Sequence, residues 1–171
     1  RYAMEEVSPT EVYDNLQKLS DFFSRKFIGL DHECLYMMLL NNRLNMIDCV
    51  LVSEGVVSSS TVPIRLMTQK ALFRKATAVV LAHNHPQGLA LPSAGDIAVT
   101  ETLASAFDAI DITLLEHLIL AGNRCYPIMQ QHSASIRLNP ANKQIDSRFY
   151  QNFYNIKYEE WRAPSFFPKM K

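Results

Sequence analysis

An almost wholly apolar run, residues 77–82, leads straight into two histidines, His83 and His85. A short run of this kind is typical of a central strand that is covered on both faces. Successive side chains of a strand point to opposite faces, so histidines at positions i and i+2 project to the same side. The feature therefore predicts a buried β-strand whose end presents two imidazoles together.

Segments with helical and extended patterns alternate around this run. Apolar residues at helical spacing predict helices, and short apolar runs bounded by turn residues predict strands. In chain order we expect a helix opening at Pro9-Thr10 and stopped by Gly29, strands 34–40 and 46–53, a helix 64–76, the strand 77–82, a helix 93–109, and strands 112–120 and 125–129. This order predicts an α/β (α+β) fold, a mixed central β-sheet flanked by helices.

The length and composition fit one domain with extensions. The chain has 171 residues, of which 48% are hydrophobic and 20% charged, enough for a packed core. We expect an N-terminal helical lead over residues 1–30, one domain over 31–130, and an aromatic-rich C-terminal extension over 131–171. About half of the aromatic residues lie in 149–167. The extension is expected either to pack back onto the domain or to form a partner surface, such as a homodimer contact.

Charge, hydropathy and cysteine usage argue against several classes of protein. Lys and Arg number 17, Asp and Glu number 17, and the net charge is zero, so a large nonspecific nucleic-acid footprint is not supported. No apolar run reaches the roughly 18 residues of a membrane span. Cys34, Cys49 and Cys125 lie in apolar runs without a Cys-x-x-Cys pair, which is typical of buried thiols in a reducing compartment. We therefore expect a cytoplasmic location.

The residues after the histidines complete a candidate metal site. Pro86 bends the chain, and Ser93 and Asp96 follow at the expected start of a helix. Two imidazole nitrogens, one carboxylate oxygen and an open fourth position describe a catalytic zinc site. Ser93 and Asp96 are also spaced as an ordinary capping box. The two interpretations are compatible, because a cap fixes the end of the helix that carries the carboxylate.

The spacing His-x-His, seven residues, Ser, two residues, Asp is the pattern of the JAB/MPN superfamily, whose JAMM-type members are zinc metalloproteases. The longer string from Ala82 to Asp96, Ala-His-Asn-His-Pro-x-Gly-x-x-x-Pro-Ser-x-x-Asp, resembles the RadC-like branch of that superfamily in bacteria. The resemblance covers roughly residues 33–129. It implies a JAB/MPN-like, cytidine-deaminase-like domain and a metallopeptidase or isopeptidase activity.

Residue roles follow from the resemblance by position. It implies that Ser93 donates a hydrogen bond to the developing oxyanion, and that an upstream glutamate serves as general acid and base. Glu33 and Glu54 are the candidates for that glutamate. Glu33 is favoured because it directly precedes the apolar run 34–40, where the glutamate of the family stands. The implied ligands of a single zinc ion are His83, His85 and Asp96.

The pair Glu116-His117 lies in the expected strand 112–120. Glu116 stands where the family commonly has aspartate. The pair is expected either to make a structural hydrogen bond within the sheet or to orient a ligand histidine.

Three functions remain open from the sequence. The leading one is a zinc-dependent hydrolase of amide, peptide or isopeptide bonds, whose peptide or amide substrate is unknown. The second is a DNA-associated accessory protein, of repair or of a mobile element, with little or no hydrolase activity. Residues 1–30 lack the glycine hairpins of the helix-hairpin-helix module often found upstream in this branch. The third is a non-catalytic scaffold, which the complete set of motif residues disfavours.

Overall fold

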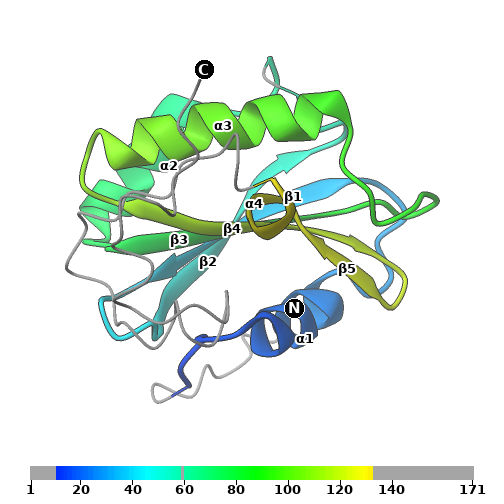
Figure 1. Cartoon of the computed structure of the whole chain (residues 1–171), viewed down its shortest axis with the longest axis horizontal. Helices are drawn as coiled ribbons and strands as arrows, with labels where there is room; N and C mark the ends of the chain where they lie inside the picture. Colours follow the sequence, from blue (N-terminus) through cyan, green and yellow to red (C-terminus); the bar gives the residue numbers. More distant parts are fainter. Residues whose placement is uncertain (1–10, 59, 133–171) are drawn as a thin grey trace.

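The structure is a computed structural model, and it describes residues 11–58 and 60–132. Four helices and five strands are formed in this part of the chain (Figure 1). In order they are α1 (Leu16–Lys26), β1 (Cys34–Leu40), β2 (Met46–Glu54), α2 (Ile64–Phe73), β3 (Ala78–Asn84), α3 (Ala94–Asp108), β4 (Thr113–Ala121), β5 (Arg124–Pro127) and α4 (Ile128–Gln131).

The five strands form one mixed sheet in the order β2-β1-β3-β4-β5. β3 and β4 pair in parallel, and the other neighbours are antiparallel. α2 and α3 cover one face of the sheet, and α1 covers the other (Figure 1). The expected fold class, a mixed central sheet flanked by helices, is confirmed.

The apolar run before His83 belongs to the central strand β3, and every residue of β3 is buried. Val79 and Leu81 pack into the core beneath α2 and α3, whereas Val80 and Ala82 pack into the core above α1. Two covered faces explain why the strand has no alternation of apolar and polar residues. The strand extends two residues beyond the expected end and includes His83.

The first helix begins later than expected, at Leu16 rather than near residue 10. The Asn15 side chain caps it by accepting a hydrogen bond from the Lys18 backbone N–H at 3.0 Å. Val12, which we expected on the helical stripe, instead forms a β-bridge with Asn45. Strand-like pairing of this segment therefore outweighs its helical pattern, and the asparagine sets the boundary. Residues 1–10 of the expected lead lie outside the described residues.

The last expected strand, 125–129, is also corrected. β5 ends at Pro127, and Ile128 and Met129 belong to the short helix α4. Proline has no N–H to continue a ladder and fits the start of a helix. The Glu116 carboxylate accepts the backbone N–H groups of Met129 at 2.6 Å and of Gln130 at 3.1 Å. A contact distant in sequence thus stabilises the helical turn.

Glu116 is fully buried, and its burial raises the pKa of its carboxyl group to about 8, against the partial opposing effect of its backbone hydrogen bonds. A raised pKa means that the folded state keeps this proton over a range where the unfolded chain has lost it. The contribution of Glu116 to the free energy of unfolding is therefore greatest below about pH 4.5 and falls as the pH rises through about 8.

We predict that Glu116→Gln changes the pH dependence of stability. Relative to the wild type, the variant should become more stable as the pH rises from about 5 to about 9, because its buried amide carries no charge. Urea unfolding in EDTA at both pH values measures the difference, with Glu101→Gln on the exposed side of α3 as the control. Parallel pH profiles for wild type and Glu116→Gln would contradict this assignment.

Candidate metal centre

The two histidines meet at the end of β3. The Nε2 atoms of His83 and His85 lie 3.0 Å apart, as expected for side chains that share a face. His83 is completely buried, whereas 17% of the His85 side chain is exposed. The pair therefore has one enclosed side and one side that opens to solvent.

Asp96 reaches the same point from the first turn of α3. The Ser93 hydroxyl accepts the Asp96 backbone N–H at 3.1 Å, and Asp96 Oδ2 accepts the Ser93 backbone N–H at 2.7 Å. This is the expected capping box. Ser93 Oγ also donates to Asp96 Oδ2 at 2.7 Å. Both groups of Ser93 thus hold Oδ2, and the other oxygen, Oδ1, lies 3.3 Å from His83 Nε2.

The donor set fits a zinc ion. One ligand atom from each of His83, His85 and Asp96 lies within 4.8 Å of the other two. Ligand atoms around tetrahedral zinc lie about 3.3–3.8 Å apart, because the bonds are about 2.0–2.3 Å long. The separations of 3.0 Å and 3.3 Å from His83 Nε2 are close to that range. Two nitrogens and one carboxylate oxygen are also the ligand types of catalytic zinc sites.

A chain of hydrogen bonds determines which nitrogen of His83 carries the proton. The Thr100 hydroxyl donates its only proton to the Asp96 backbone carbonyl at 2.6 Å. Thr100 Oγ1 must therefore accept from His117 Nδ1, which lies 2.7 Å away. His117 Nε2 is then an acceptor, and His83 Nδ1, 2.9 Å away, donates to it. This leaves His83 Nε2 with a lone pair that faces the cluster.

The Nε2 atom of His85 is also left with a lone pair, through a hydrogen bond to a residue close in sequence. Its Nδ1 lies 2.9 Å from the carbonyl oxygen of Leu89, and it must donate there because a carbonyl only accepts. His85 Nε2 is thereby left unprotonated in the neutral ring. Two nitrogen lone pairs and a carboxylate oxygen thus face one another without a proton between them. Such a set of acceptors is stabilised by a shared cation.

Burial keeps the enclosed histidines neutral. It lowers the pKa of His83 to about 4, an effect that the neighbouring Asp96 partly offsets and His85 adds to. Burial also lowers the pKa of His117 well below its usual value, with further lowering from His83 and His85. A neutral imidazole is the form that binds a metal ion.

We predict that Thr100→Val weakens zinc binding about 10–100-fold, because it removes the acceptor that fixes the tautomers of His117 and His83. Thr100→Ser keeps the hydroxyl and should retain affinity near that of the wild type. Competition with a chromophoric chelator measures both constants. Equal affinity in the valine and serine variants would show that the hydrogen-bond chain does not set the metal site.

Glu33 stands at the same end of the sheet as the cluster. Leu35 pairs with His83 across β1 and β3, so continuing the antiparallel register places Glu33 opposite His85. Alternation along β1 puts Glu33 on the face of Leu35, the face covered by α2 and α3. Its Oε2 accepts the Val57 backbone N–H at 3.3 Å. The geometry therefore places Glu33 on the same face and at the same end of the sheet as the candidate metal centre.

Asn84, between the two histidines, holds the segment that carries Glu33. Its side-chain oxygen accepts the Cys34 backbone N–H at 2.7 Å, and its side-chain nitrogen donates to the His32 carbonyl at 2.9 Å. The two bonds grip the chain on either side of Glu33. Asn84 is thus a positioning residue that the spacing of the motif did not reveal.

The alternative glutamate lies elsewhere. Glu54 ends β2 and pairs with Cys34, which by alternation belongs to the face covered by α1. Glu33 and Glu54 are therefore on opposite faces of the sheet. Of the two, the geometry favours Glu33 as the acid or base at the cluster.

The expected pair in β4 divides into two separate functions. His117 contacts His83 directly, whereas the Glu116 carboxyl group binds backbone N–H groups of His117 and of α4. Thr100 was not predicted from the sequence. Its position four residues after Asp96 places it one turn further along α3, a spacing that could have indicated it.

The structure also bears on the expectations for the cysteines, for membrane-spanning segments and for the C-terminal extension. Of the three free cysteines, Cys34 is buried as expected, and Cys49 and Cys125 are only half-buried. Within residues 11–58 and 60–132, none of the helices combines the length and the hydropathy that a membrane crossing requires. The aromatic extension lies almost entirely beyond the described residues, so its expected packing or dimer contact stays a prediction.

The fold and the cluster together define an α/β domain with a His-His-Asp candidate metal centre at the end of its central strand. The model of the RadC-like JAB domain family matches residues 13–134, and the chain belongs to this family.

Curated relatives agree with this assignment. The chain is 35% identical to UPF0758 protein YfjY of Escherichia coli over 114 residues, which are 67% of this chain and 71% of YfjY. It is 30% identical to UPF0758 protein PSHAa2643 of Pseudoalteromonas translucida over 125 residues, which are 73% of this chain and 56% of that protein. The chain spans little more than half the length of PSHAa2643 and of the similar UPF0758 proteins of Aromatoleum aromaticum and Shewanella.

Proposed function

We propose that this protein is a zinc-dependent hydrolase of amide bonds, with a peptide or isopeptide as substrate. The observation that most strongly supports this proposal is that His83 Nε2, His85 Nε2 and an Asp96 oxygen lie within 4.8 Å of one another. The histidines' other ring nitrogens are committed to His117 and to the Leu89 carbonyl. Three acceptors directed at one point support a resident cation.

Zinc held by these residues would supply Lewis-acid activation of a water molecule and of the substrate carbonyl. In this proposal the Glu33 carboxylate takes a proton from that water molecule and returns it to the leaving amine. Among the described residues, its Oε2 accepts only the long 3.3 Å bond from Val57 N–H, which leaves acceptor capacity for the proton.

Ser93 has two tasks in this proposal. Its hydroxyl donates to Asp96 Oδ2 at 2.7 Å and so keeps the carboxylate oriented. When a substrate carbonyl gains negative charge, the same hydroxyl can turn its proton to that oxygen, because the Ser93 backbone N–H still holds Asp96 Oδ2.

The loop after His85 offers a surface for an extended substrate. Leu89 and Leu91 are 63% and 55% exposed. They line a hollow of about 350 Å³ together with Ala90, Arg124 and Cys125. Apolar side chains exposed beside a reactive centre support a substrate with an apolar chain next to its amide bond.

The test is metal-dependent release of amines. Full-length protein is loaded with zinc and incubated with a peptide mixture and with lysine-branched isopeptides, and new amines are detected with fluorescamine. The proposal expects release that EDTA abolishes, that added zinc restores, and that Glu33→Gln lacks. Amine release that persists in EDTA would contradict the proposal, and release that persists in Glu33→Gln would remove Glu33 from the mechanism.

A further inference from the structure

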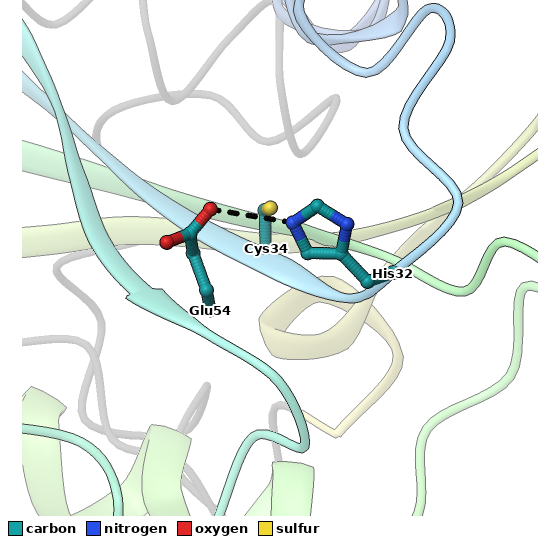
Figure 2. A group of neighbouring side chains, drawn as sticks. All are labelled: His32, Cys34 and Glu54. Carbon is teal, nitrogen blue, oxygen red and sulfur yellow. Dashed lines mark hydrogen bonds and ion pairs between the residues drawn. The ribbon is translucent and has the colours of Figure 1, made fainter.

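A second group of metal-ligating side chains lies on the other face of the sheet. His32 and Cys34 flank Glu33 in the sequence, and Glu54 ends the neighbouring strand β2 (Figure 2). One ligand atom from each of the three residues lies within 4.8 Å of the other two. Figure 2 shows the imidazole, the thiol and the carboxylate directed toward a common point.

We propose that His32, Cys34 and Glu54 form a second site for zinc or a similar divalent transition metal. The backbone brings these three side chains together. His32 and Cys34, at positions i and i+2, share a side of the chain, and the strand register places Glu54 directly opposite Cys34. This site is independent of the proposed hydrolase activity, because none of its ligands belongs to the first cluster.

The separation of the imidazole and carboxylate ligand atoms agrees with a tetrahedral ion. His32 Nε2 lies 3.3 Å from Glu54 Oε1, and ligand atoms of tetrahedral zinc are about 3.3–3.8 Å apart. Nitrogen, sulfur and carboxylate oxygen suit zinc or cobalt, whereas calcium and magnesium prefer sites made of oxygen alone. On binding, the Cys34 thiol releases its proton to solvent, and the thiolate bonds to the ion.

The surroundings of His32 resemble those of a metal ligand. Its other ring nitrogen, Nδ1, lies 2.9 Å from Asp31 Oδ1. A carboxylate on the far nitrogen of a ligand histidine fixes the ring and its tautomer. Asn84 holds the backbone at both flanking residues, through the Cys34 N–H and the His32 carbonyl. Two of the three ligands therefore start from a fixed backbone.

The site differs from the first cluster in exposure. Cys34 is 2% exposed, whereas the side chains of His32 and Glu54 are 47% and 61% exposed. A buried sulfur with two exposed partners leaves the remaining coordination position open to solvent. An ion bound there would tie His32 and Cys34, the residues on either side of Glu33, to the end of β2.

Cobalt titration of the full chain separates the two sites. The first cluster contains no sulfur, so only the second can give thiolate-to-cobalt charge-transfer absorption in the near ultraviolet. We expect this absorption in the wild type and in His83→Ala, and its loss in Cys34→Ser. Cys49→Ser is the matched control and should retain it.

A second variant keeps the test decisive if Cys34→Ser does not fold. Glu54→Gln changes an exposed side chain and should weaken the cobalt affinity of the absorbing site at least tenfold, whereas Glu101→Gln should not. Three results would overturn the proposal: no charge-transfer absorption in the wild type, absorption that persists in folded Cys34→Ser, or wild-type affinity in Glu54→Gln.

Discussion

Glu33→Gln is expected to lower the turnover of zinc-dependent amide hydrolysis about 10²–10⁴-fold, the usual contribution of a positioned general acid and base. The glutamine keeps the size of the side chain and can still accept the Val57 N–H. It can neither take a proton from water nor deliver one to an amine. The zinc content of the protein should therefore stay at the wild-type value while turnover falls.

Turnover in two other glutamate variants, Glu101→Gln and Glu54→Gln, tests whether the effect is specific to Glu33. Glu101→Gln, on α3, serves as the control and should hydrolyse at the wild-type rate. Turnover retained in Glu33→Gln together with turnover lost in Glu54→Gln would assign the proton transfer to the other glutamate. It would also contradict the register argument, because Glu54 lies on the face of the sheet away from His83.

His83→Ala is expected to weaken zinc binding at the first cluster by more than about a hundredfold, beyond the 10–100-fold cost of losing an outer partner. His83 is the fully buried ligand, and its Nε2 lies 3.0 Å from His85 Nε2 and 3.3 Å from Asp96 Oδ1. Its removal leaves only two of the three ligands. Hydrolysis should be lost together with the metal.

The zinc affinity of the first cluster is measured in the Cys34→Ser background, because this substitution removes the proposed second site. Chelator competition gives the zinc affinity with and without His83→Ala. His132→Ala removes a histidine that contacts Tyr126 instead, and it should bind zinc with the affinity of the background. Equal affinities with and without His83 would show that zinc binds elsewhere.

The features that could be predicted from the sequence are local. The apolar run before His83 predicted the central strand, and the i, i+2 spacing predicted that two imidazoles would share a face. Ser93 and Asp96 predicted the start of α3 through ordinary capping. Each of these arguments depends on residues within one or two turns or strand positions, where side-chain direction follows from the backbone alone.

The features that could not be predicted depend on strand register. Asn84 reaches Cys34, 50 residues away in sequence, and Glu54 meets Cys34 only because β1 and β2 pair with one particular offset. A shift of one residue would move every side chain of β1 to the other face. Sequence periodicity does not determine such an offset. The sequence favoured Glu33 over Glu54 only through the resemblance, whereas their separation onto opposite faces of the sheet is seen only in the fold.

The misplaced start of α1 and the misplaced end of β5 have a similar cause. Val12 continues the helical stripe of α1 but is drawn into a bridge with Asn45, and Met129 ends an apolar run but is turned into α4 by the carboxylate of Glu116. In both cases a partner distant in sequence outweighs the local pattern. Tertiary contacts of this kind override secondary-structure propensity.

The most direct test of the central claim is zinc-edge anomalous diffraction from crystals of the zinc-loaded full chain. We expect an anomalous peak about 2.0–2.2 Å from His83 Nε2, His85 Nε2 and an oxygen of Asp96. A zinc-loaded crystal with no peak between these three residues would contradict that claim.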